Sequence, residues 1–218
     1  MEQSVLGIIY FVALSHGLML AISLWKNAKV GSPSKWLTII AAIICYKLFE
    51  GAALHTGLYK YVPHTMGLLP YMVLIIGPLL WVYVRQVTGL TKLHPFIFAA
   101  NFIPALAIWL FNFPSVFRAA EEKVTMWNYV LDSSGGELPW FYIVLLLSIK
   151  AHLGIYLALS WHLISKLKLI SNELRADNSK LVLTSMQFMV VAFFLLELLW
   201  VSLFVAQQFF GIGTLSSV

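Results

Sequence analysis

The stretch WLTIIAAIICYKLFEGAALHTGL (residues 36–58) has the length and apolar character of a membrane-spanning helix, yet it contains Lys47, Glu50 and His55. A helix needs about 20 mostly apolar residues to cross the hydrocarbon core of a bilayer. Ionisable side chains inside such a segment almost always face the interior of a helix bundle, where they find partners. The stretch therefore predicts a spanning helix that packs against other helices through its polar side chains.

The remainder of the chain has the same character. Of its 218 residues, 61% are hydrophobic and 11% are charged, and the mean hydropathy is +0.87. This composition excludes an ordinary soluble domain. Apolar runs of about membrane length lie at residues 5–25, 36–58, 68–84, 96–113, 140–163 and 183–210. We therefore predict an all-α, polytopic membrane helical bundle with six transmembrane spans, which forms a single domain over residues 1–218.

The basic residues predict the topology. Nine lie in the loops at residues 26–35, 85–94 and 165–180, and three lie in the opposite loops, at Lys60, Arg118 and Lys123. Basic loops stay cytoplasmic, so the N-terminus is expected outside. The flank of the first run, MEQS, has no basic residue, so we interpret that run as a retained helix rather than a signal peptide. The net charge of +5 is then explained by topology and by contact with anionic lipids.

Two features allow both an architectural and a functional interpretation. Gly77 and Pro78 fall in the middle of the third run, where proline should kink the helix, either as fixed architecture or as a hinge. In the loop at residues 114–138, apolar residues recur at helical spacing from Val116 to Leu131, with Val124 and Trp127 among them, while Asn128 faces elsewhere. That pattern predicts an amphipathic helix, which either connects two spans or forms a lid over an outward-facing pocket.

The polar side chains within the spans are the candidate site. They are Lys47, Glu50, His55, Lys150, His152 and Glu197. Two lysines and two glutamates sum to zero charge if all are ionised, so mutual pairing is expected to cost less than four separate desolvated ions. Such a network can be a polar ligand site, a proton-sensitive switch, or a clamp that fixes the register of the helices.

Catalysis finds little support in the sequence. The six histidines are scattered without metal-ligand spacing, and no serine–histidine grouping or glycine-rich phosphate loop occurs. We therefore expect no catalytic residues, no metal, no cofactor and no enzymatic activity.

Most of the chain resembles a known family. The carrying features are His55, Gly57, Leu58 and Tyr59 at the end of the second run, Pro63 and His64 in the following loop, GPLLWVYVRQVTG at residues 77–89, and the HPF and NFIPAL motifs that open the fourth run. In these features the chain is similar to the N-terminal membrane region of bacterial AraC-type transcriptional regulators that carry an integral-membrane sensor. The similarity is clearest from about residue 36 to residue 113.

The resemblance implies about seven spans in a bacterial cytoplasmic (inner) membrane, followed by a cytoplasmic helix-turn-helix domain. This sequence contains six runs and no helix-turn-helix segment, so a seventh span and the DNA-binding domain are expected beyond Val218. The expected function is a membrane sensor whose partners are lipids, a small-molecule or membrane signal of unknown identity, and nucleic acid only through that further domain; homodimerisation stays open. The alternative is a small transporter for a polar solute, with the buried charges along its path.

Overall fold

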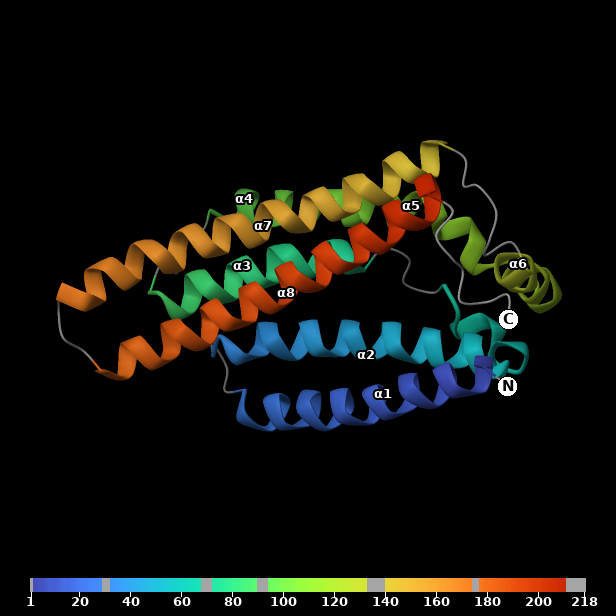
Figure 1. Ribbon diagram of the computed structural model, residues 1–218, viewed down its shortest axis with the longest axis horizontal. Coiled ribbons are helices and arrows are strands. Elements are labelled where there is room, and N and C mark those ends of the chain that lie inside the picture. Colours follow the sequence, from blue (N-terminus) through green and yellow to red (C-terminus); the bar gives the residue numbers. More distant parts are fainter. Residues whose placement is uncertain are drawn as a thin grey trace. The chain divides into compact units, whose positions relative to one another are not determined.

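The computed structural model describes residues 2–28, 32–67, 72–89, 94–132, 140–173 and 177–210. Throughout these ranges the regular structure is helical, which confirms the all-α prediction. The elements are α1 (Glu2–Asn27), α2 (Ser34–Thr56), η1 (Leu58–Lys60), η2 (Pro63–Thr65), α3 (Val73–Val87), α4 (Pro95–Ala100), α5 (Ile103–Val116), α6 (Ala120–Asp132), α7 (Trp140–Glu173) and α8 (Asp177–Phe210), as Figure 1 shows.

Four helices are long and apolar enough to cross a membrane. The segments that qualify are Val5–Asn27, Ser34–Thr56, Ile143–Lys168 and Val182–Ala206. They coincide with the predicted runs at residues 5–25, 36–58, 140–163 and 183–210. The lengths and compositions of these helices indicate a membrane protein.

The other two predicted runs are not confirmed as spans. The run at residues 68–84 appears as α3, whose 15 residues extend about 22 Å, less than the hydrocarbon thickness of about 30 Å. The run at residues 96–113 is divided between α4 and α5 by a turn at Asn101 and Phe102. Pro104 follows this turn, and its missing N–H prevents the hydrogen bond that a continuous helix would make there. Helix α5 in turn meets α6 at a bend of 117°, so length and composition support four spans, or five if that bent pair counts as one.

The contacts group the helices into two compact units. The first contains α1, α2, α5 and α6, and the second contains α3, α4, α7 and α8. The single domain over residues 1–218 remains a prediction.

In the first unit, α1 and α2 run antiparallel and pack along their lengths (Figure 1). Small residues allow this approach. A Cβ on Gly17 would lie 2.9 Å from the Cys45 sulfur, and a Cβ on Gly51 would lie 2.6 Å from the ring of Tyr10. Glycines at such positions let two membrane helices come close enough for extensive van der Waals contact.

In the second unit, α7 and α8 form an antiparallel hairpin, and α3 packs beside α7 and runs in the same direction (Figure 1). Helix α3 is the most enclosed of the three, with both Gly77 and Pro78 buried. A Cβ on Gly77 would lie 3.1 Å from the Tyr156 side chain and 3.2 Å from that of Leu153. Gly77 therefore serves close packing of α3 against α7, while its function as a hinge with Pro78 stays a prediction.

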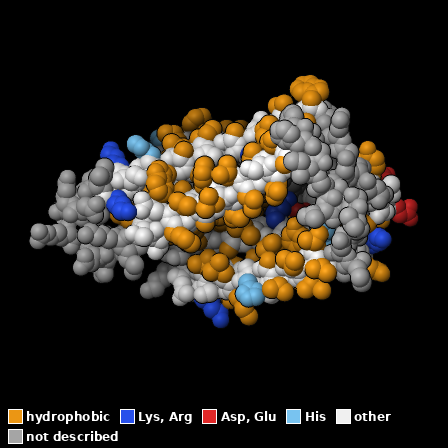
Figure 2. All heavy atoms as spheres, viewed as in Figure 1, with side chains coloured by type: hydrophobic (Ala, Val, Ile, Leu, Met, Phe, Trp, Pro, Cys, Tyr) orange, Lys and Arg blue, Asp and Glu red, His pale blue; other side chains and the backbone are white. Residues whose placement is uncertain are grey.

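Large apolar side chains cover the outer faces of the long helices. Exposed examples are Ile8, Ile9 and Met19 on α1 and Phe188 and Leu196 on α8. Figure 2 shows hydrophobic side chains over both helix hairpins on the face that it presents. A water-soluble monomer seldom exposes apolar surface of this extent, whereas lipid chains would solvate it.

Candidate functional site

The first polar centre is an ion pair within α2. The Lys47 ammonium lies 2.6 Å from Glu50 Oε2, and the two side chains are 34% and 13% exposed. Residues three apart on a helix lie on neighbouring faces, so this contact follows from the sequence spacing. The predicted pairing of a lysine with a carboxylate is confirmed here.

Glu50 also binds the segment that follows α2. Its Oε1 accepts hydrogen bonds from the Tyr46 hydroxyl at 2.7 Å and from the backbone N–H of Gly67 at 2.8 Å. Gly67 has a φ of +66°, a left-handed conformation that favours glycine. The Tyr46 hydroxyl lies 2.9 Å from the Thr65 carbonyl oxygen as well, and its single proton can be shared between the two acceptors. One half-buried carboxylate therefore holds the end of this segment onto a long apolar helix.

We call residues 57–67 together with α6 the cap. Tyr59 and Met66 form its buried core, against which Val124 and Trp127 pack. The Tyr59 hydroxyl donates to the side-chain oxygen of Asn128. The apolar face predicted for the amphipathic helix is thus confirmed at Val124 and Trp127.

The structure corrects two details of that helix. It begins at Ala120 rather than near Val116, which ends α5 instead. Asn128 was expected to face away from the cap core, but it accepts the Tyr59 hydrogen bond because the segment after α2 folds back over this side of α6. Lys123, which counts among the basic residues of this loop, is 4% exposed and donates to the Val116 carbonyl oxygen at 2.8 Å. Burial lowers the pKa of the Lys123 ammonium. The side chain of Leu131 lies outside the described residues.

The second polar centre joins α7 to α8. The Lys150 ammonium lies 3.0 Å from Glu197 Oε1, and both side chains are 17% exposed. The same ammonium lies 4.2 Å from the centroid of the Trp200 ring, a cation–π contact. Glu197 Oε2 is buried and has no hydrogen-bond partner within the described part of the chain. Both partners of each ion pair therefore lie within the same unit.

The two candidate histidines contact aromatic rings. His55 stacks on Tyr10 of α1, with ring centroids 5.5 Å apart and planes 11° apart. His152 meets the ring of Tyr156 edge-on at 5.0 Å, and the Tyr156 hydroxyl lies 2.5 Å from the side-chain oxygen of Asn101. The described contacts thus place both histidines in helix packing rather than in the two ion pairs.

Sequence reasoning missed several participants. Tyr46 precedes Glu50 by four residues and Trp200 follows Glu197 by three, so helical spacing could have identified both. Gly67 and Asn128 carried no such signal, because the turns after α2 and the docking of α6 bring them into contact. These are tertiary contacts between distant positions.

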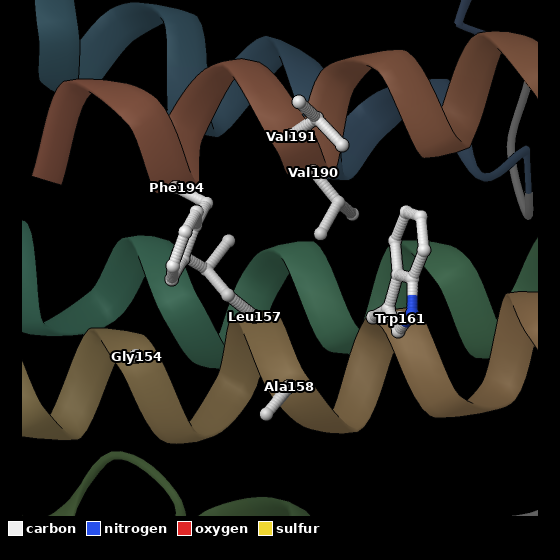
Figure 3. A pocket seen from close by; sticks show the side chains of 7 residues that line it. All are labelled: Gly154, Leu157, Ala158, Trp161, Val190, Val191 and Phe194. Carbon is white, nitrogen blue, oxygen red and sulfur yellow. The ribbon is translucent and has the colours of Figure 1, made fainter. Parts of the chain in front are cut away.

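A groove opens between α7 and α8 (Figure 3). Its volume is about 390 Å³, and its walls are apolar side chains of both helices. Among the described residues no three His, Cys, Asp or Glu side chains are grouped so that they could hold a metal ion. The polar centres consist of oppositely charged pairs, which suits them to coupling helices and holding the cap.

No protein-family model, curated protein or solved structure matches this chain.

Proposed function

We propose that this chain is a membrane-embedded signal-sensing module of the kind that it resembles in AraC-type transcriptional regulators. In this proposal it has six spans with the N-terminus outside, lies in the bacterial inner membrane, and relays a ligand- or membrane-derived signal to a cytoplasmic DNA-binding domain. The observation that carries the proposal is the set of contacts at Glu50, which links the cap directly to an ion pair inside α2.

The coupling follows from charge and burial. Glu50 lies six residues before the end of α2 at Thr56, about 9 Å along the axis. A ligand or lipid change that moved the cap would remove the Gly67 N–H and disturb the Tyr46 hydroxyl, leaving the carboxylate with Lys47 alone. A carboxylate that loses donors in a poorly solvated site becomes less stable in its charged form, so α2 or its partner must adjust. The cap and α2 therefore have two states, one with the contacts between Glu50 and the cap formed and one with these contacts broken.

Several features support six spans. Helix α3 runs parallel to α7 and antiparallel to α8 (Figure 1), as the third, fifth and sixth spans of an alternating topology must. Because α3 is mostly buried, its short length need not match the bilayer. Trp25 and Trp140, near the ends of α1 and α7, are exposed, as in the aromatic belts at membrane interfaces.

Cysteine labelling in intact cells tests the topology. In a Cys45→Ala background, Tyr61→Cys on the cap should react with an impermeant maleimide from outside. Lys166→Cys near the end of α7 should react only after the membrane is permeabilised. The opposite pattern would refute the proposed orientation.

The native gene tests the output. A helix-turn-helix in frame after the Val218 codon is expected, and a stop codon there would refute the transcriptional part. Given that domain, Glu50→Gln should hold the expression of its target genes at one level with or without the signal. The control, Glu121→Gln on the exposed face of α6, should respond as the wild type does. A normal response of Glu50→Gln would show that the cap contact transmits nothing.

One observation favours the alternative, a carrier for a polar solute. Glu197 has a buried oxygen without a described partner beside the Lys150 ammonium, so the pair could exchange contacts with a passing solute. Solute flux in proteoliposomes that Glu197→Gln abolishes would support the carrier over the sensor.

A further inference from the structure

The groove between α7 and α8 has walls suited to a hydrocarbon chain. Gly154, Leu157, Ala158 and Trp161 line it from α7, and Val190 and Phe194 line it from α8. Figure 3 shows these side chains flanking the open space, with Gly154 and Phe194 toward one end and Trp161 toward the other. No atom lies within 4 Å of the position that a Cβ on Gly154 would occupy, so space remains beside the backbone there.

A cation lies beyond the Trp161 end of this groove. Residues 154, 158, 161, 165 and 168 recur at helical spacing on one side of α7, and residues 194, 190 and 187 do so on α8. The ammonium of Lys168 donates to the side-chain oxygen of Gln187 at 3.0 Å, which places a positive charge between the two helices on that line. The groove is thus apolar along its length and basic at one end.

The length of this arrangement matches one leaflet of a bilayer. Gly154 and Lys168 are 14 residues apart, about 21 Å along the helix. Half of the hydrocarbon core is about 15 Å thick, and the headgroup region adds about 5–7 Å. With Lys168 at the phosphate level, Gly154 therefore lies near the bilayer midplane, and Trp161 lies within the leaflet.

We propose that the α7–α8 groove is a binding site for one anionic phospholipid, with an acyl chain between Gly154 and Trp161 and the phosphate on Lys168. The proposal rests on membrane insertion and not on the sensor function, so it survives if no transcriptional output exists. The basic loop after α7 belongs to the cytoplasmic side in the proposed topology, where anionic headgroups and lysines attract each other.

Native mass spectrometry of the purified chain tests the charge. With dioleoylphosphatidylglycerol as the anionic probe and dioleoylphosphatidylcholine as the neutral one, the wild type should retain the anionic lipid preferentially. Lys168→Gln should weaken that binding about five-fold, the equivalent of about 1 kcal/mol for one lysine near a headgroup. The matched control, Lys166→Gln, changes an exposed lysine two residues away and should leave the affinity unaltered. Equal retention of both lipids, or equal effects of both substitutions, would overturn the proposal.

Filling the groove tests the acyl-chain site. Gly154→Leu places a side chain in open space and should reduce binding of the anionic lipid at least ten-fold while helical content and folding are kept. Ala158→Leu is a second filling variant, and Leu159→Met on the same helix outside the groove lining is the control. Unchanged lipid binding in both filling variants refutes the site. A change in oligomeric state without a change in lipid binding would also refute it, because it would identify the groove as an interface between copies of the chain.

Discussion

The ion pair between α7 and α8 should be the polar contact on which the second unit depends most. Glu197→Gln removes the negative charge while keeping the shape of the side chain, and it leaves the Lys150 ammonium with an uncharged acceptor. Removing one partner of a buried pair costs about 3–5 kcal/mol when the remaining charge finds no other contact. Both side chains here are 17% exposed, so the pair is largely, though not wholly, enclosed.

Two contacts reduce that cost. The Trp200 ring remains 4.2 Å from the ammonium, and a cation–π contact of this kind contributes about 1–2 kcal/mol. The glutamine also retains a carbonyl oxygen that can accept a hydrogen bond from Lys150. We therefore expect Glu197→Gln to lower the free energy of unfolding by about 2 kcal/mol, a change of about 30-fold in the ratio of folded to unfolded protein.

Equilibrium unfolding in bicelles measures this value. The control is Glu121→Gln, an exposed glutamate on α6, which should stay within about 0.5 kcal/mol of the wild type. The double variant Glu197→Leu with Lys150→Met should be more stable than Glu197→Leu alone or Lys150→Met alone, since it leaves no unpaired charge. The ion pair does not hold α7 to α8 if Glu197→Gln has the same free energy of unfolding as its control. The same conclusion follows if the effects of the two single substitutions add up to the effect of the double variant.

Three further changes test other parts of the structure. Gly77→Ala places a Cβ 3.1 Å from the Tyr156 side chain on α7 and should destabilise the chain by about 1–2 kcal/mol. Gly154→Ala places its Cβ in open space and should stabilise the chain by about 0.5–1 kcal/mol. The midpoint temperatures of thermal unfolding in detergent should therefore shift in opposite directions. Tyr59→Phe removes the hydroxyl bonded to Asn128 and should cost about 1 kcal/mol, seen as faster amide exchange in α6 but not in α8. Burial holds the pKa of Lys123 below the ordinary 10.5. Between the folded-state and unfolded-state pKa values the folded state binds fewer protons than the unfolded state, so the free energy of unfolding should rise with pH up to 10.5. Lys123→Met should flatten this rise, and an unchanged slope would show that another group titrates.

Much of the fold was readable because membrane solvation acts on each segment separately. An apolar run of sufficient length forms a helix in lipid because its backbone groups have no other partners there, and this holds for α1, α2, α7 and α8. The pairing of Lys47 with Glu50 was readable for a similar reason, since three residues of helix bring them together whatever the rest of the chain does. The apolar face of α6 followed from its helical spacing as well.

The limits of the sequence appear where two distant segments meet. Zero net charge among the buried ionisable residues indicates that partners exist, but it did not specify that Lys150 would select Glu197, 47 residues away, and also contact Trp200. The burial of Lys123 and the bond from Gly67 to Glu50 depend on how helices and turns dock. The sequence alone determined which segments would be helical in lipid, because the free energy of transferring a segment into lipid depends on that segment alone. It also determined that the charges would be paired, because an unpaired charge is costly in lipid. Only the tertiary structure decided which groups meet, because a hydrogen bond or an ion pair requires two particular atoms to lie within about 3 Å of each other.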